Sequence, residues 1–439
     1  MDSFIIDISF CVMFAIVPLI VLVLLHYVNV SLRIFSVPSL FIIFYLISAY
    51  VGIFPLYFGL DAYHKELGII DSAIILRMFF YSSASLILAI CGFLYAYHVI
   101  GFNNIVAKYN VQVSANRKQR VFIFCLILIC CLVLLKYISQ IETIALFKAL
   151  DGDILGAAVA RSDMSNALSG EGKYWHYKIF FRSILDYCVI FFYADYLITR
   201  RRVSGLVFGV GFLAAAFSAT MAIEKGPFVF LLVMLYLTFV IYRGGEYWQS
   251  VAKYPVFIMV GFIPIFYIYF MGQEGIASSI YSIVSRVFSG QIAPAYFYLD
   301  LFPSRFNYLL GASFPNPGGL LPFHVYPLTM EVVKFMSPES IAKGIVGSAP
   351  TVFWTEMYAN FGPIGIVFSS FLVGVGLFFV SHILSMLSLS PPVIAATVSL
   401  AMHYKDLSGT SLSNYFFDSY LIAISTVTFL SLLLNRRSI

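Results

Sequence analysis

Residues 347–374 read GSAPTVFWTEMYANFGPIGIVFSSFLVG, and this passage from a polar stretch into a long apolar run shows most directly how the chain is built. Ser348 is a residue type that caps the free amides at a helix N-terminus, and Pro350 is well suited to a first helical turn. We therefore expect a short helix to start here and to run to about Phe361.

Two polar residues of that expected helix, Glu356 and Asn360, are four positions apart and therefore share one face. Gly362 and Pro363 break the helical pattern just before the next apolar run, which would bring the carboxylate to the mouth of a membrane span. One interpretation is that Glu356 only caps or solvates an interfacial helix. Because a retained acid is costly in such apolar surroundings, a functional role is the other interpretation.

The composition excludes an ordinary soluble protein. Hydrophobic residues make up 61% of the 439 residues, charged residues make up 11%, and the mean hydropathy is +0.94. We therefore expect an all-α polytopic membrane protein, folded as a single transmembrane bundle over residues 1–439. The net charge of +5 does not indicate a nucleic-acid partner, because membrane proteins distribute Lys and Arg by membrane side. All six cysteines lie in apolar runs, so we expect no structural zinc, no redox chemistry and no cofactor.

Runs of about 20 apolar residues predict 11 transmembrane helices. The N-terminal run lacks the preceding basic region of a cleavable signal peptide, so we expect it to be the first span. The runs are 5–27, 35–58, 74–97, 121–140, 178–198, 204–222, 227–243, 254–272, 363–386, 391–409 and 415–434.

The basic loops indicate the orientation, since cytoplasmic loops are enriched in Lys and Arg. Each basic cluster follows an odd-numbered run, which places the N-terminus outside and the C-terminus inside. The clusters are Arg33; Lys108, Arg117, Lys118 and Arg120; Arg200, Arg201 and Arg202; Arg243 and Lys253; and Arg436 with Arg437.

This orientation puts two long loops, 141–177 and 273–362, on the outer face. Within the second loop, IASSIYSIVSRVFSG (276–290) has the apolar spacing of an amphipathic helix lying at the membrane interface. The stretch FPNPGGLLPFHVYP (314–327) is rich in turn residues and is not expected to be helical.

Cations gather on the expected outer face, where they suit the diphosphate of a lipid-linked substrate. The alternative is snorkelling toward lipid headgroups, to which we assign Lys178 and Arg182. Arg161 and Arg286 have no evident snorkelling role, and Lys225 lies in a loop so short that we expect its side chain to face a central cavity. The full set is Arg161, Lys173, Lys178, Arg182, Lys225, Arg286 and Arg305.

His403 could accept a proton near neutral pH, although a lone histidine near a helix end is more often a structural hydrogen-bonding group. Asp151 and Asp153 match the acid-x-acid pattern of metal-dependent nucleotide-sugar transferases. Nucleotide sugars are cytoplasmic and this loop is expected outside, so a polar turn is the better interpretation. No spacing typical of metal ligands appears.

The stretch 347–374 together with ARSDMSNALSGEGKYW (160–175) resembles the bacterial O-antigen polymerase (Wzy) family of oligosaccharide repeat-unit polymerases. That family often carries an arginine with a glycine some ten residues on in its outer loop, and Arg161 and Gly172 have about this spacing. Many spans with two long outer loops extend the similarity over nearly the whole chain. The second loop departs from the pattern, because neither of its arginines is followed by a glycine at that spacing.

The resemblance implies a relative of the C-type glycosyltransferases in the bacterial inner membrane. Such an enzyme moves the growing polymer from undecaprenyl pyrophosphate onto a newly arrived lipid-linked repeat unit at the periplasmic face, usually with a separate chain-length co-polymerase. Lipid-linked oligosaccharide would be both donor and acceptor. The other partners would be the lipids of the membrane around the protein. In this hypothesis Arg161, Lys225 and Arg286 bind the diphosphate and Glu356 takes the acceptor proton, with His403 a further candidate. The candidates for sugar binding are Arg305, Asn360, Tyr358, Trp354, Lys173, Tyr174 and Trp175.

Two other functions are compatible with the sequence. An O-antigen ligase would use the same donor with a lipid A core acceptor and would depend on an outer-loop histidine, either His324 or His403. A flippase for the lipid-linked unit would need charges along a path through the bundle, for which Arg77 and Asp186 are the deeper candidates.

Overall fold

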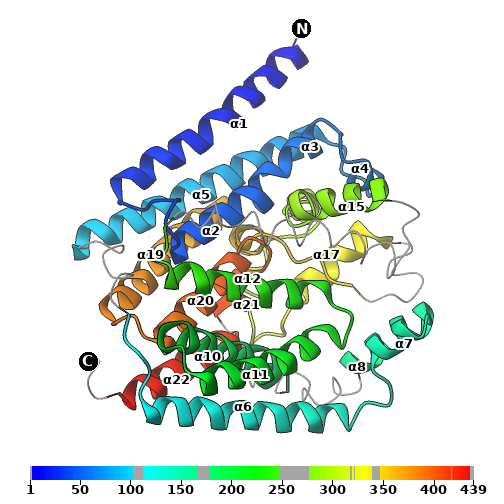
Figure 1. Ribbon diagram of the computed structural model, residues 1–439. Coiled ribbons are helices and arrows are strands. Elements are labelled where there is room, and N and C mark those ends of the chain that lie inside the picture. The colour runs from blue at the N-terminus through cyan, green and yellow to red at the C-terminus, as the bar shows by residue number, and fades with distance from the viewer. Residues whose placement is uncertain are drawn as a thin grey trace.

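The structure, a computed structural model, describes residues 2–101, 112–166, 177–246, 276–316, 319–320, 322–338, 347–416 and 418–435. In these ranges the regular secondary structure is helical, without a β-sheet (Figure 1). Its helices are α1 (Asp2–Tyr27), α2 (Val37–Tyr45), the π-helix η1 (Leu46–Val51), α3 (Ile53–Tyr57), α4 (Ala62–Glu66), α5 (Ser72–Ile100), α6 (Arg117–Ile138), α7 (Ala145–Leu150), α8 (Ile154–Asn166), the π-helix η4 (Ile179–Ile184), α10 (Leu185–Thr199), α11 (Arg202–Thr220), α12 (Lys225–Tyr242), α15 (Ile276–Phe288), α16 (Pro294–Leu301), α17 (Leu328–Met336), α19 (Phe353–Met386), α20 (Pro391–Asp406), α21 (Leu412–Phe416) and α22 (Ser419–Leu433).

Six helical segments in the described ranges are long and apolar enough to cross a membrane, so the chain is a multi-pass membrane protein. They are Phe4–Tyr27, Val37–Tyr57, Ser72–Ile100, Arg117–Ile138, Arg202–Thr220 and Phe353–Met386. Six is fewer than the 11 apolar runs of the sequence, because several runs form helices shorter than 18 residues, such as α10, α20 and α22. The run 254–272 lies outside the described residues.

Helices α5 and α19 pack closely because glycine lets their backbones approach each other. A Cβ atom on Gly92 of α5 would lie 2.1 Å from the carbonyl oxygen of Phe371 on α19. The reverse contact is tighter still, since a Cβ on Gly374 would lie 1.7 Å from the carbonyl oxygen of Ala89. The hydroxyls of Ser85 and Ser370, 2.7 Å apart, add a hydrogen bond between the same two helices.

The structure corrects the expected start of the helix that carries Glu356. This helix, α19, starts at Phe353 and has no side-chain cap, whereas Ser348 is exposed in the preceding irregular segment. That segment is not helical, and its polar groups bond to neighbouring elements: the amide of Ala349 donates to the carbonyl of Thr329 at 3.0 Å. The expected break is confirmed, since Gly362 has φ 65° and ψ −153° within α19.

Helices that lie within the two long loop segments, 141–177 and 273–362, gather at one end of the bundle, which we call the loop end. In Figure 1 this is the right-hand end, where α4, α7, α8, α15 and α17 lie. The last turn of α22 lies at the opposite end, which we call the C-terminal end. Helix α15 (Ile276–Phe288) confirms the helix expected from IASSIYSIVSRVFSG. Its apolar side chains Ile280, Val284 and Val287 are exposed, whereas its polar Ser285 is buried, as expected for a helix facing lipid.

An ion pair joins three helices toward the C-terminal end. The guanidinium of Arg120 on α6 donates to both carboxylate oxygens of Asp195 on α10, at 2.8 and 3.0 Å. The hydroxyl of Ser204 on α11 donates to the same carboxylate at 2.6 Å. A buried acid is stable only when its oxygens are paired in this way, so this cluster holds α6, α10 and α11 together.

Candidate functional site

Glu356 lies in the first turn of α19 and is only 4% exposed. Its Oε2 accepts a hydrogen bond from the amide of Ser413 at 2.8 Å, and its Oε1 accepts one from the Ser413 hydroxyl. The hydroxyl of Ser313 is 3.3 Å from the same Oε1. The carboxylate therefore joins α19 to the 302–316 loop and to α21, two segments that are about 100 residues apart in sequence (313 versus 413).

Asn360, one turn further along α19, shares this cluster as the sequence spacing predicted. Its Oδ1 accepts from the amide of Gly311 at 2.8 Å, and its Nδ2 donates to Ser313 Oγ at 2.7 Å. The backbone continues the contact, because the amide of Leu310 donates to the carbonyl of Asn360 at 3.0 Å. The amide of Asn360 and the carboxylate of Glu356 thus share the Ser313 hydroxyl, and together they form a polar cluster in an otherwise apolar helix bundle.

This cluster belongs to the loop end. Just before α19, the hydroxyl of Thr351 donates to the carbonyl of Gln291 in the turn between α15 and α16, at 2.7 Å. The first amide of α19, that of Phe353, donates to the carbonyl of Leu407 in the connector from α20 to α21, at 3.0 Å. Chemically, a carboxylate surrounded by serine hydroxyls and an amide is a site suited to recognising hydroxyl groups and to accepting a proton from one.

The cations singled out in the sequence are distributed over several elements. Arg161 on α8 and Arg286 on α15 are both exposed, on helices of the two different loops, and both helices lie at the loop end (Figure 1). Arg305 pairs with Asp300 at 3.0 Å and its guanidinium lies 5.9 Å from the ring of Phe335. Lys225 is the first residue of α12, and its side chain, like Lys173, Tyr174 and Trp175, lies outside what the structure describes.

Arg182 was assigned to snorkelling, but the structure gives it a partner within the protein. Its guanidinium, only 13% exposed, lies 3.1 Å from the carboxylate of Glu224 at the start of α12. The π-helix η4 carries Arg182, and single π-helical turns are frequent at functional sites. The pair joins η4 to α12 at the short loop before Lys225, the loop that the sequence had singled out.

Two aromatic residues expected to stack on sugars are instead in the protein interior. Trp354 is completely buried and lies near Tyr81, with 6.0 Å between ring centroids. Tyr358 is also buried, and its hydroxyl donates to the carbonyl of Phe302 at 3.2 Å. Neither ring has a face open to a ligand in this structure, because residues on the inner side of α19 pack against α5 and the 302–308 loop.

His403 is buried between two aromatic rings rather than open to substrate. Its ring stacks on Tyr415 and Tyr420, with centroids 4.2 and 5.3 Å away. Its Nδ1 is 3.8 Å from the carboxylate of Asp418, and its Nε2 is 3.3 Å from the carbonyl oxygen of Tyr415. These contacts match the structural role that the sequence offered as the alternative.

A Ser–His–Asp group occurs at the loop end but is not a catalytic triad. Asp61 and His64 lie at α4, and Ser285 lies on α15. Both Asp61 Oδ2 and the Ser285 hydroxyl contact the same ring nitrogen, His64 Nδ1, at 2.8 and 3.3 Å. A triad requires contacts to opposite ring nitrogens, so this group fastens α15 to α4. Burial raises the pKa of Asp61, but hydrogen bonds from Ser285 and His64 outweigh burial and leave that pKa below its usual value.

Asp153 has the structural role expected for a polar turn. Its carboxylate accepts a hydrogen bond from the amide of Gly156 at 2.8 Å and lies 3.7 Å from the ammonium of Lys148. These contacts cap the start of α8. Across the described residues, no group of three or more His, Cys, Asp or Glu side chains is placed to hold a metal ion.

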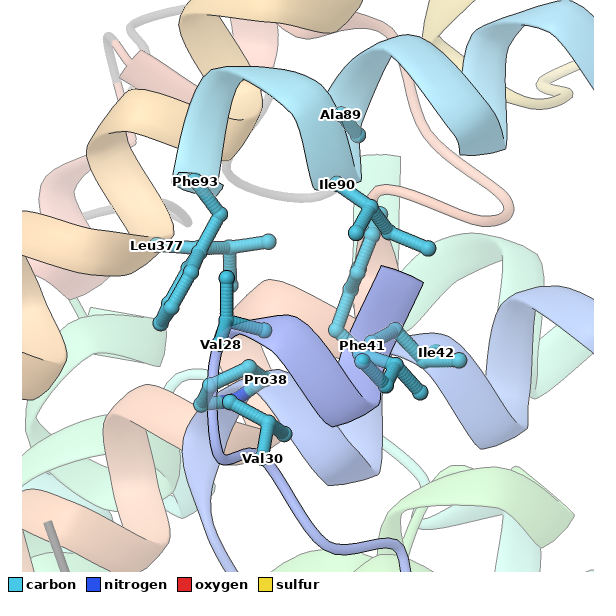
Figure 2. A pocket seen from close by; sticks show the side chains of 10 residues that line it. Val28, Val30, Pro38, Phe41, Ile42, Ala89, Ile90, Phe93 and Leu377 are labelled. Carbon is cyan, nitrogen blue, oxygen red and sulfur yellow. The ribbon is translucent and has the colours of Figure 1, made fainter. Parts of the chain in front are cut away.

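A pocket between α1, α2, α5 and α19 has no side chain that could bind an ion or take part in a reaction. Figure 2 shows that apolar side chains from these helices surround it, and no polar side chain lines it. Leu377 lines it from α19, 21 residues beyond Glu356 and on the other side of the break at Gly362, so this pocket is separate from the Glu356 cluster. The lining residues are Leu25, Val28, Val30, Pro38, Phe41, Ile42, Ala89, Ile90, Phe93 and Leu377.

Sequence reasoning found Glu356 and Asn360 but missed the side chains around them. Ser313 lies next to the turn-rich stretch of the second loop, and Ser413 belongs to the hydroxyl-rich segment DLSGTSLSN at 406–414. That segment interrupts two apolar runs, which was a usable signal. Lys405, just before it, is buried and was also missed as a candidate. In comparisons with known proteins, no family model, no curated protein and no solved structure matches this chain.

Proposed function

We propose that this protein is a membrane-embedded glycosyltransferase that polymerises lipid-linked oligosaccharide repeat units. In this proposal the bundle crosses the bacterial inner membrane 11 times, with its N-terminus in the periplasm and its C-terminus in the cytoplasm. The loop end then lies at the periplasmic face, where undecaprenyl-pyrophosphate-linked sugars are presented.

One observation carries the proposal: a buried carboxylate, Glu356, lies in a cluster of hydroxyl and amide groups at the loop end of the bundle. Acids are expensive inside membrane proteins, and those that are retained commonly serve function. Two exposed arginines, Arg161 and Arg286, lie at the same end on helices of separate loops. A sugar diphosphate substrate needs both kinds of group.

The reaction assigns a role to each of these groups. The acceptor hydroxyl oxygen forms a bond to the anomeric carbon of the donor sugar, while the bond from that carbon to the diphosphate breaks. Glu356 takes the hydroxyl proton, with the acceptor hydroxyl replacing a serine hydroxyl as its hydrogen-bond partner. Arg161, Arg286 and Lys225 stabilise the negative charge on the departing lipid diphosphate. Asn360 and Arg305 position the sugars.

The deciding experiment is reconstitution. Purified protein in liposomes is supplied with lipid-linked repeat units, and the products are resolved by gel electrophoresis. Longer lipid-linked chains made without an ion gradient support a polymerase and exclude a flippase. Arg161→Ala and Arg286→Ala each lower the rate by about a hundredfold if these residues stabilise the leaving group. Wild-type rates from both variants would overturn the assignment of the arginines.

Deletion in the native host separates polymerase from ligase. Loss of a polymerase leaves a single repeat unit on the lipid A core, whereas loss of a ligase leaves none. The burial of His403 between Tyr415 and Tyr420 gives no support to a ligase built on that histidine.

A further inference from the structure

Lys405 is a buried cation that the mechanism above does not use. It lies in the last turn of α20, and its side chain is only 6% exposed. The ammonium lies 4.0 Å from the centre of the Phe230 ring on α12 and 5.7 Å from that of Phe44 on α2. A snorkelling lysine would extend its ammonium to water, so this side chain is held inside the bundle for another reason.

The carboxylate partner of Lys405 is poorly suited to a permanent ion pair. Among the described residues that partner is Asp406, the next residue in the chain, whose side chain is 52% exposed. Neighbouring residues on a helix point in different directions, so the two side chains must bend to meet. The Arg120–Asp195 pair shows what a permanent pair looks like in this protein, with two hydrogen bonds to a fully buried acid. Asp406 can leave Lys405 simply by turning into solvent.

Lys405 is connected directly to the Glu356 cluster. Its carbonyl accepts a hydrogen bond from the hydroxyl of Ser408 at 2.7 Å, at the start of the connector to α21. In the same connector the carbonyl of Leu407 accepts the first amide of α19, and the connector leads into α21, whose Ser413 donates to Glu356. Phe230 is 39% exposed, so one of the rings beside the ammonium is itself at the protein surface. Phe230 lies in the second turn of α12, close to the short loop of Glu224, so this is the side from which a phosphate would have to reach Lys405.

We propose that Lys405 binds a phosphate of the lipid-linked diphosphate, and that Asp406 is its partner when no anion is bound. The inference rests on the proposed function for the identity of the ligand. A buried ammonium with aromatic walls strengthens its interaction with phosphate, because little water competes for the charge. In binding, the phosphate replaces the Asp406 carboxylate and that carboxylate moves into solvent, so the buried charge stays paired.

The test measures anion binding by the purified full-length protein in nanodiscs of zwitterionic phosphatidylcholine. The probes are inorganic pyrophosphate and farnesyl diphosphate, with farnesol as the control for the apolar tail, and affinity is measured by isothermal titration calorimetry. Lys405→Gln is expected to weaken binding of both diphosphates by about tenfold or more. Lys405→Arg retains much of the affinity. Asp406→Asn binds as well as the wild type or better, because the competing carboxylate is gone.

A matched control is Lys334→Gln, which removes an exposed lysine paired with Glu331 on α17 and is expected to leave affinity unchanged. Wild-type affinity in Lys405→Gln would overturn the proposal. So would an Asp406→Asn variant that folds but binds as weakly as Lys405→Gln, since Lys405 and Asp406 would then be a structural pair. If Lys405→Gln does not fold, Lys405→Arg and Asp406→Asn are compared with the wild type. Diphosphate affinity retained in both supports the proposal, and affinity lost in Asp406→Asn overturns it.

A further arm distinguishes the lipid-linked diphosphate from an ordinary lipid headgroup. In nanodiscs that also contain phosphatidylglycerol, the affinity of the wild type for pyrophosphate is expected to stay within about twofold of its value in phosphatidylcholine. Any further loss from repulsion by the anionic surface would be the same in Lys405→Gln. If phosphatidylglycerol competes with pyrophosphate in the wild type but not in Lys405→Gln, the site binds a phospholipid headgroup and the proposal is overturned. Polymerase activity with diphosphate binding independent of Lys405 refutes this inference alone. Lys405-dependent binding without polymerase activity refutes the proposed function alone.

Discussion

The amide and the hydroxyl of Ser413 both donate to the carboxylate of Glu356, the amide to Oε2 at 2.8 Å and the hydroxyl to Oε1. This relationship places the short helix α21 against the first turn of α19. Replacing Glu356 should therefore have two effects that can be measured separately, one on the stability of the fold and one on the rate of the proposed reaction.

Replacing Glu356 by Gln preserves the shape of the side chain but turns one acceptor oxygen into a donor group. We expect the loss of hydrogen bonds to a charged group to lower the free energy of unfolding by about 2 kcal/mol. We also expect polymer formation to fall by about a hundredfold, because the proton acceptor is gone. Thermal unfolding in detergent and the reconstituted polymerase assay measure the two effects. Ser413→Ala is the control: we expect it to lower the free energy of unfolding as well, but to keep most of the activity. Equal polymerisation rates for Glu356→Gln and wild type would contradict the role of Glu356 as a base.

Gly362→Ala tests the break within α19. Gly362 has a positive φ that residues with a side chain rarely adopt, and an added Cβ would lie 2.9 Å from the Tyr308 ring. We expect a loss of about 1–3 kcal/mol in the free energy of unfolding, read as a lower midpoint of thermal unfolding. Gly209→Ala in α11, where an added Cβ meets no atom within 4 Å, serves as the control and is expected to be neutral or stabilising. Equal midpoints for the two variants would show that the break does not constrain the fold.

Asp195→Asn tests the ion pair toward the C-terminal end. Asp195 is fully buried, so the substitution leaves the Arg120 guanidinium without its countercharge. The expected loss in the free energy of unfolding is about 3 kcal/mol, measured by thermal or denaturant unfolding of the purified protein. The exposed Lys148–Asp153 pair provides the comparison, because Lys148→Gln is expected to cost less than about 1 kcal/mol. Similar losses in both variants would show that burial does not govern these pairs.

The Asp61–His64–Ser285 group predicts a dependence of stability on pH. The pKa of Asp61 is lowered in the folded protein, so the folded state favours the charged carboxylate. This contribution to stability is fully present above the unfolded pKa, about 4, and is lost as pH falls through the lower folded pKa. Asp61→Asn is therefore expected to be less stable than wild type at pH 7, with a difference that shrinks below about pH 4.

Thermal unfolding of wild type and Asp61→Asn between pH 7 and pH 3 measures that difference. Asp300→Asn is the control, because its carboxylate pairs with a largely exposed arginine and contributes little to stability. A constant gap between wild type and Asp61→Asn over the whole pH range would mean that the charge of Asp61 does not stabilise the attachment of α15 to α4.

Part of the candidate site followed from local sequence alone. The four-residue spacing of Glu356 and Asn360 predicted a shared helix face, and the Gly362–Pro363 pair predicted the break, because both are properties of neighbouring residues. The start of α19 could not be predicted in the same way. Segment 347–352 bonds to Thr329 and Gln291, and those partners come from other parts of the chain.

The sequence by itself determined that this is a multi-pass helical membrane protein, because the apolar length needed to cross a bilayer is a local property of the chain. Only the tertiary structure decided which polar residues meet. It joined Glu356 to Ser313 and Ser413, buried Trp354 and enclosed Lys405 between Phe230 and Phe44. The reason is that hydrogen-bond partners and burial depend on helix packing, which brings together residues that are far apart in the sequence.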